Sequence, residues 1–475
     1  MPEDEIEDAS NSHSVSGEGN IVAGRDVNIT VTGVDPGIHA GVVSQNEKLR
    51  GIFEGFGLDP DAEDFEDKAR KLLNDAKVAE ESGSHIDPEE MIRLGYVALY
   101  QGRESEASEY VNKALKISKR SEDKFCQAGA IGALSDIAVW KGEFAEARRL
   151  AEESLRIGQA LENVQLISAG LGQIGKIEHG LGNYDKAESL YQQSLSIKVE
   201  NPEDFDPSSI TATMNNLGLT YLQSSRLLEA DDVLKKTLEL KVAGEESSSS
   251  VVTTILNIAS VCYLRGEFQQ AMILYLNSLE TCKEDGLRTH EAGILKSIGD
   301  IFAERNEFER AKEAYFESLG IYSDIGDLLT QRDVRINLAN SLIPLGEFSE
   351  AERELSISEE LSDAMALTSN RDELDVAWGS LHFHRREFSE AKARLESVVS
   401  RIGDNTNRTM ALCLYNLAII ALMSDYGVSE TLFRKSLSIH LEIGLAVPPY
   451  MVEWGYTDPS EEWDFPPNEW EELLP

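Results

Sequence analysis

Six polar side chains that could contact a ligand recur in phase along the chain, each inside a predicted helix. They are Gln173, Asn216, Asn257, Ser297, Asn337 and Asn416. Asn is a poor residue for a helix interior because its side chain competes for backbone hydrogen bonds, so its recurrence needs a reason. An amide offers both a donor and an acceptor, which suits the backbone of an extended peptide. The alternative is that these side chains form hydrogen bonds between neighbouring helices and set their register.

No catalytic constellation accompanies these residues. The sequence has no HExxH, GxSxG or Walker pattern. The closest histidines, His382 and His384, lie at i and i+2 of a predicted helix, so their rings should point apart. The four cysteines have no metal-binding or CxxC spacing, and we expect them to be small buried residues in a reducing compartment. We therefore expect a non-enzymatic protein with no metal and no cofactor.

A repeat of close to 40 residues positions the six side chains. A small residue recurs in steps of 40, 40, 43, 41, 40, 40 and 40 residues. Its positions are Gly95, Ser135, Gly175, Gly218, Ala259, Gly299, Ala339 and Gly379. An alanine follows each of them by twelve residues, at Ala107, Ala147, Ala187, Ala230, Ala271, Ala311, Ala351 and Ala391. Self-similarity at a fixed period of this size is typical of a solenoid.

Each unit is predicted to be a hairpin of two amphipathic helices. In the fourth unit, Leu217 to Tyr221 place their apolar side chains on one helical face. A turn such as Gly142-Glu143-Phe144 then ends the first helix, since Gly allows a positive φ. The second helix ends in Ser-Leu-x-Ile, as at Ser154 to Ile157. Small residues at the crossing let the helix axes approach closely, so a large residue in place of Ala271 should overpack it.

The order of small residue, twelve-residue step, Gly-x-aromatic turn, alanine and Ser-Leu pair resembles the tetratricopeptide repeat. The resemblance covers residues 83–443, about nine repeats, and implies an all-α solenoid whose hairpins form a right-handed superhelix. The repeat is longer than the standard 34 residues and is similar to the long-repeat class of kinesin light chains and bacterial peptide-sensing regulators. Two units depart from the pattern at their turns, the fourth with Ser224-Ser225-Arg226 and the ninth with Asp425-Tyr426-Gly427.

The same resemblance bears on the six polar residues. In proteins with this repeat, Asn on the first helix often contacts peptide ligands, so the resemblance implies peptide contacts here. The usual carboxylate clamp also needs Lys or Arg beside the amides. The neighbouring positions in this chain are mostly neutral or acidic, which argues against capture of an acidic C-terminus by these residues.

The net charge of this protein argues against binding to nucleic acids or anionic membranes. Its 85 acidic and 44 basic residues give a formal net charge of −41, which repels polyanions and anionic membranes. One interpretation is an acidic, highly soluble surface. The other is a prokaryotic, haloarchaeal protein, since scarce lysine and dense carboxylates are common in a salt-loving cytoplasm. The acidic N-terminus is not a secretory signal, and the most apolar run, 410–423, is too short to span a bilayer, so we expect a cytoplasmic protein.

Three segments flank the clear repeats. Residues 1–40 form an acidic leader in which the alternating pattern at 14–33 predicts a β-hairpin. A lone hairpin is marginal in water, so it should dock on something or pair with copies of itself. Residues 41–82 are predicted to be degenerate capping helices, at 43–56 and 61–81. Residues 444–475 form an acidic tail with three of the five tryptophans, which is either disordered or packed on the last helices or the concave groove.

The sequence therefore predicts a scaffold or adaptor that binds a protein or an extended peptide on the concave face of its solenoid. One alternative is a peptide- or ligand-responsive signalling regulator whose superhelix changes pitch on binding. Another is a component of a prokaryotic conflict or defence system that assembles through the leader, with self-association at residues 14–33.

Overall fold

The computed structural model describes Phe56, Leu58 and residues 65–81, 86–100, 103–364, 371–403, 408–423, 426–442 and 458–460. This part of the chain is all-α, with helices, turns and no strand. The predicted β-hairpin at 14–33, the predicted helix at 43–56 apart from Phe56, and nearly all of the tail at 444–475 lie outside it. Among the described helices, none has the length and apolar character that a bilayer span requires.

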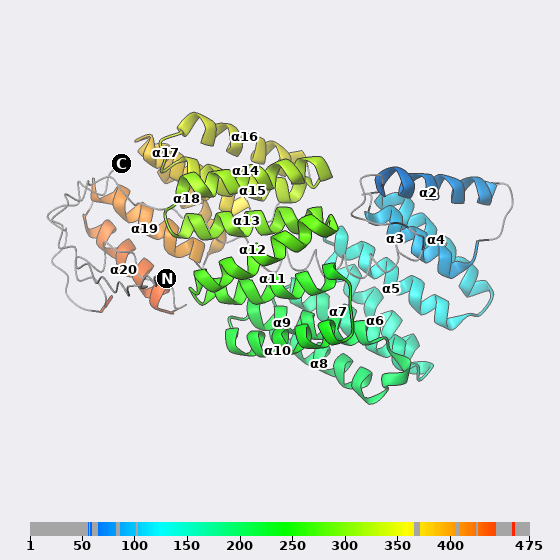
Figure 1. Ribbon diagram of the computed structural model, residues 1–475. Coiled ribbons are helices and arrows are strands. Elements are labelled where there is room, and N and C mark those ends of the chain that lie inside the picture. Colours follow the sequence, from blue (N-terminus) through cyan, green and yellow to red (C-terminus); the bar gives the residue numbers. More distant parts are fainter. Residues whose placement is uncertain are drawn as a thin grey trace, which may run out of the picture. The chain divides into compact units, whose positions relative to one another are not determined.

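Helix hairpins follow one another along the chain as the repeat predicts (Figure 1). The first helices of the hairpins, called A helices below, are α3 (Pro88–Tyr100), α5 (Lys124–Trp140), α7 (Val164–Gly180), α9 (Pro207–Gln223), α11 (Ser248–Leu264), α13 (Arg288–Glu304), α15 (Leu328–Leu342), α17 (Arg371–His384) and α19 (Arg408–Leu422). The second, or B, helices are α4 (Glu104–Arg120), α6 (Phe144–Ala160), α8 (Tyr184–Glu200), α10 (Leu227–Ala243), α12 (Phe268–Asp285), α14 (Phe308–Ile325), α16 (Phe348–Ala364), α18 (Phe388–Ile402) and α20 (Tyr426–Glu442). Helix α2 (Phe65–Glu81) precedes them, within the predicted 61–81, and a 3₁₀ turn, η1 (Pro202–Asp204), lies in a longer linker.

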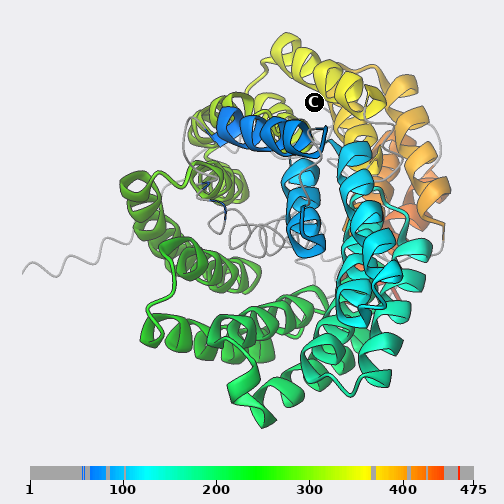
Figure 2. The same ribbon diagram turned by 90° about the vertical axis from the view of Figure 1, so that its right-hand side faces the viewer.

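The described helices belong to two compact units. The N-terminal unit contains the described residues up to 345 and 349–371, and the C-terminal unit contains 346–348 and the described residues from 372 onward. Within the N-terminal unit, each helix from α2 to α15 packs on the next in chain order (Figure 2). The A helices of consecutive hairpins also contact one another, from α3 and α5 through α13 and α15, whereas consecutive B helices make no comparable contact among the described residues. The A helices therefore form the closer-packed layer.

The small residue of each repeat marks where the two helices of a hairpin cross. A Cβ added at Gly218 would lie 2.6 Å from Leu234 Cδ2, and one added at Gly299 would lie 2.6 Å from Tyr315 Cε1. In both hairpins the opposing residue is 16 positions later, on the B helix. The alanines that follow by twelve residues are all buried with no exposed surface. Both columns thus remove side-chain volume where the helix axes must approach.

Serines of several B helices add a hydrogen bond between the two helices of their hairpin. The Ser of the Ser-Leu-x-Ile pattern donates its hydroxyl to an A-helix carbonyl 26 residues earlier. The Oγ–O distances are 2.9 Å from Ser154 to Ala128, 3.0 Å from Ser194 to Ser168 and 2.8 Å from Ser318 to Ala292. A buried hydroxyl with such a partner avoids the cost of an unpaired polar group, and the bond fixes the register of the two helices.

The turn of the fourth hairpin is kept although its sequence departs from Gly-x-aromatic, whereas residues 424–425 of the ninth turn lie outside the described residues. Gly142, Gly266 and Gly346 have φ between 72° and 75°, as the pattern predicts. In the fourth unit Ser225 takes the same left-handed conformation with φ 60°, and its amide donates to Leu222 O. The aromatic that follows the turn begins the B helix, as at Phe268, whose ring lies 5.6 Å from that of Tyr263 on the preceding A helix. The four cysteines are buried and form no disulfide with one another.

Candidate functional site

The six predicted ligand-binding residues all lie on A helices. Each precedes the small residue of its repeat by two positions, on α7, α9, α11, α13, α15 and α19. Five of them belong to the N-terminal unit, and Asn416 belongs to the C-terminal unit. Since the A helices of the N-terminal unit contact one another in order, the five residues there lie on one continuous layer.

Three of the six are almost completely buried. Asn257 is 6% exposed, Asn337 is 4% exposed and Asn416 is 1% exposed. Asn257 Nδ2 donates to Asn215 Oδ1 on the preceding A helix over 3.0 Å, whereas Asn416 Nδ2 donates to Leu412 O of its own helix over 3.0 Å. Their burial leaves these side chains little surface to offer a ligand in the described structure.

The other three keep part of their surface exposed. Gln173 Nε2 on α7 donates to Gly132 O on α5 over 3.0 Å, across 41 residues of sequence. Ser297 Oγ donates to Gly293 O within α13 over 3.0 Å. The backbone carbonyl of Asn216 accepts the Thr220 hydroxyl over 2.8 Å. Gln173, Asn216 and Ser297 are therefore the members of the column that reach both the A-helix layer and its surface.

Asp300 is a polar centre of this layer that the sequence did not single out. Its Oδ1 accepts the Tyr315 hydroxyl over 2.7 Å and Asn337 Nδ2 over 3.0 Å, and its Oδ2 accepts Lys296 Nζ over 2.9 Å. Burial, with the charge of Asp300 beside it, holds the pKa of Tyr315 well above its usual range, so the phenol stays protonated and donates. With 85 acidic residues in the chain, no sequence signal distinguished this one.

A polar ladder thus links the A helices from α9 to α15. Its bonds join Asn215 to Asn257 and Asp300 to Asn337, and the Tyr263 hydroxyl on α11 donates to Glu304 Oε1 on α13 over 3.2 Å. Polar groups buried between helices stabilise only when they are paired. The ladder therefore holds neighbouring A helices in register and keeps hydrogen-bonding groups along one layer.

The two closely spaced histidines have separate partners. His382 Nδ1 lies 2.6 Å from Glu387 Oε2, while His384 Nδ1 lies 2.9 Å from Ser380 O. Burial lowers the pKa of His384, so its ring favours the neutral form. Within the described ranges, no group of three or more His, Cys, Asp or Glu side chains is placed to hold a metal ion.

Part of the chain matches models of a known repeat family. Residues 91–120, 127–200, 166–241 and 254–289 match models described as tetratricopeptide repeat. A comparison with curated proteins finds no match.

Solved structures are similar over most of the chain. The apo form of the quorum sensor NprR from B. thuringiensis is 15% identical, with a TM-score of 0.54 over 76% of this chain and 99% of that one. The apo form of RapI is 13% identical, with a TM-score of 0.53 over 75% and 98%. The Rap conjugation gene regulator of the plasmid pLS20, solved in complex with the Phr* peptide, is 13% identical, with a TM-score of 0.52 over 76% and 97%.

At these identities the likeness concerns the fold, which is that of an α-solenoid of helix hairpins. The family matches, the 40-residue spacing of the crossings and the hairpin geometry agree with one another. The chain therefore contains tetratricopeptide repeats.

Proposed function

We propose that this protein is a non-enzymatic scaffold that binds an extended peptide or protein segment along its A-helix layer. The observation that carries the proposal is the in-phase series of partly exposed polar side chains on α7, α9 and α13 of that layer, namely Gln173, Asn216 and Ser297. An extended peptide presents a donor and an acceptor at each residue, which amide side chains can match. A solved structure of similar fold holds a peptide, which supports a peptide ligand for a stack of this kind.

Under this proposal the six residues have two roles. Asn257 and Asn337 act inside the layer, where they hold neighbouring A helices in register, and Asn416 is buried within the C-terminal unit. Gln173, Asn216 and Ser297 contact the ligand. The division rests on burial. The buried residues fit the explanation of hydrogen bonds inside the helix stack, and the partly exposed residues fit the explanation of ligand contact.

The proposal can be tested with peptides selected from a random library for binding to the wild-type protein. The triple variant Gln173→Ala, Asn216→Ala, Ser297→Ala should weaken binding of a selected peptide by at least about tenfold. It should lower the melting temperature only slightly, through loss of the hydrogen bond from Gln173 to Gly132 O. The double variant Asn257→Ala, Asn337→Ala should lower the melting temperature instead. Unchanged peptide affinity in the triple variant would exclude these side chains from binding.

A peptide-responsive regulator is the second candidate function. It is favoured by fold likeness to a peptide-bound conjugation gene regulator over 76% of this chain. Such a protein must couple ligand binding to a change in another surface. If it is one, adding a selected peptide should change hydrogen exchange in helices that the peptide does not contact, whereas protection confined to the A helices beneath the peptide would leave only the scaffold role.

A further inference from the structure

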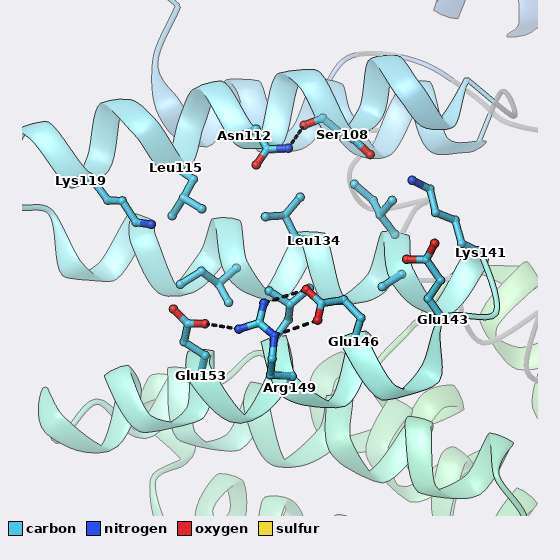
Figure 3. Close-up of a pocket in the computed structure, with 14 residues that line it drawn as sticks. Ser108, Asn112, Leu115, Lys119, Leu134, Lys141, Glu143, Glu146, Arg149 and Glu153 are labelled. Carbon is cyan, nitrogen blue, oxygen red and sulfur yellow. Dashed lines mark hydrogen bonds and ion pairs between the residues drawn. The ribbon is translucent and has the colours of Figure 1, made fainter.

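A groove opens in the N-terminal unit between two consecutive B helices, on residues that play no part in the polar ladder (Figure 3). Helices α4 and α6 form its walls and α5 forms its floor. Its volume is about 380 Å³, within the range of pockets that hold small ligands or a few side chains. None of the six column residues lines it, so it does not depend on the function proposed above.

Short side chains keep this groove open. In the next two repeats the equivalent space is spanned by a B-helix side chain bonded to the following A helix, Arg148 Nη1 to Glu178 Oε1 at 2.8 Å and Tyr221 Oη to Glu188 Oε1 at 3.0 Å. The first repeat has Ser108 where those repeats have Arg148 and Glu188, and α5 has Ala138 where they have Glu178 and Tyr221. Neither short side chain can bridge the gap.

One turn further along α4, Asn112 also leaves the groove open. Its Nδ2 donates to Ser108 O of its own helix over 2.8 Å, so the side chain lies back along α4, as Figure 3 shows. The equivalent residues of the next repeats are the longer Glu152 and Gln192.

The floor of the groove carries an apolar side chain that other repeats bury. Leu134 precedes the small residue of its repeat and remains partly exposed, beside Leu115. The eight equivalent residues of the other described A helices are all buried, at Leu94, Ile174, Leu217, Ile258, Ile298, Leu338, Trp378 and Leu417. Apolar surface at the base of a concave site favours an apolar side chain of a ligand, because contact removes both surfaces from water.

Each end of the groove carries one exposed lysine. Lys119 and Lys141 lie at opposite ends (Figure 3), and neither forms an ion pair with a described residue, although Glu143 also lines the groove beside Lys141. The third cation, Arg149, is held by Glu146 at 2.7 Å and Glu153 at 3.1 Å. In a chain with nearly twice as many acidic as basic residues, two exposed lysines without acidic partners are available for carboxylates of another molecule.

We propose that this groove docks a short acidic segment of a partner protein, with a bulky apolar side chain on Leu134 and Leu115 and carboxylates at Lys119 and Lys141. The apolar contact supplies most of the affinity, because exposed ion pairs are weak individually. The two lysines select the charge of the partner, since like charges placed against them are excluded. The protein would then hold two different segments at once, one on its A-helix layer and one between B helices.

The probe for this site is a fluorescein-labelled synthetic peptide, EEWEELLEE. Its binding to the full chain is followed by fluorescence polarisation at about 0.15 M salt, where exposed charges outside the groove are largely screened. Ser108→Arg with Ala138→Glu copies the Arg148–Glu178 pair into the groove and should weaken binding at least about tenfold. Lys119→Glu with Lys141→Glu should do the same. The matched control is Lys116→Glu with Arg120→Glu, which reverses two exposed charges of α4 outside the groove lining and should leave affinity within about twofold.

Three peptide or variant results would overturn the proposal. They are equal binding of a peptide with lysine in place of every glutamate, equal binding of one with serine in place of Trp and Leu, and full affinity of the groove-closing variant. If the closing variant does not fold, judged by circular dichroism, the Lys119→Glu, Lys141→Glu variant decides, because both side chains are exposed. Light scattering tests whether a second copy of this chain occupies the groove. A wild-type dimer that the closing variant converts to a monomer would show that the occupant is another copy and would overturn the proposed acidic partner.

Discussion

Gly299 on α13 offers the sharpest test of the close crossing inside each hairpin. An added Cβ there would lie 2.6 Å from Cε1 and 2.8 Å from Cδ1 of Tyr315, whereas ordinary contact begins at 3.4 Å. The ring has little freedom to turn away, because it is 1% exposed and its hydroxyl donates to Asp300. The helices would have to separate by most of an ångström, or the phenol would have to leave its hydrogen bond.

Gly299→Ala has two opposing effects on the free energy of unfolding. Alanine is favoured over glycine in a helix interior by about 1 kcal/mol, whereas overpacking costs about 1–3 kcal/mol. Because two ring atoms lie well inside contact distance, we take the upper half of that range and expect a net loss of about 1–2 kcal/mol. The neighbouring hairpin already pairs Ala259 with Tyr275, so the substitution tests the spacing of α13 and α14 rather than the pair of residue types.

The matched control is Gly320→Ala on α14. Gly320 is also inside a helix, but it is exposed and an added Cβ would meet no atom within 4 Å. It should therefore gain up to about 1 kcal/mol. Urea unfolding followed by far-UV circular dichroism gives both midpoints at a comparable slope, and midpoints remain comparable even if the stack unfolds in steps. If Gly299→Ala unfolds at the same or higher urea concentration than wild type, the argument for a tight crossing is wrong.

The remaining predictions concern hydrogen bonds, a turn and a buried amine. Ser318→Ala removes the donor to Ala292 O and should lower the free energy of unfolding by about 1 kcal/mol in urea titrations; no change would show that the bond is not formed. Ser225→Gly relieves a left-handed φ of 60° and should raise the free energy of unfolding by up to about 1 kcal/mol in the same titrations. A lower free energy of unfolding would show that this φ is not a source of strain. Burial, aided by the charge of Lys176, lowers the pKa of Lys198 from 10.5 to about 8. The unfolded state then binds the proton more tightly, so Lys198 lowers stability most below pH 8 and progressively less up to pH 10.5. The melting temperature of Lys198→Met relative to wild type should accordingly fall from about pH 7 to about pH 10, and a constant difference would contradict the shifted pKa.

The fold was predictable because its determinants are local and repeated. Gly218 and Leu234 meet 16 residues apart within one hairpin, and a helix face carries its own periodicity in the sequence. Where the turn pattern failed, at Ser225, the backbone still took the left-handed conformation, because the packing of the flanking helices outweighs the preference of one residue.

The candidate site was less predictable because its bonds join residues about 40 positions apart. The column predicted which side chains share a layer, but not which of them would be buried. Asn337 donates to Asp300 and is buried, whereas Gln173 reaches a backbone carbonyl and keeps an exposed part. That difference depends on the spacing of neighbouring A helices, which is set by side chains of several repeats together.

The groove shows a second reason why function in a repeat protein is hard to infer from its pattern. Averaging over repeats emphasises the residues that all units share, and those residues here build the crossing, the turn and the hairpin bond. Ser108 and Ala138 matter because they lack what their equivalents, Arg148 and Glu178, supply. In a stack whose units are otherwise alike, a binding surface arises where one unit leaves unfilled a space that its neighbours fill. The departures from the repeat, rather than its consensus, are therefore where specific contacts should be sought.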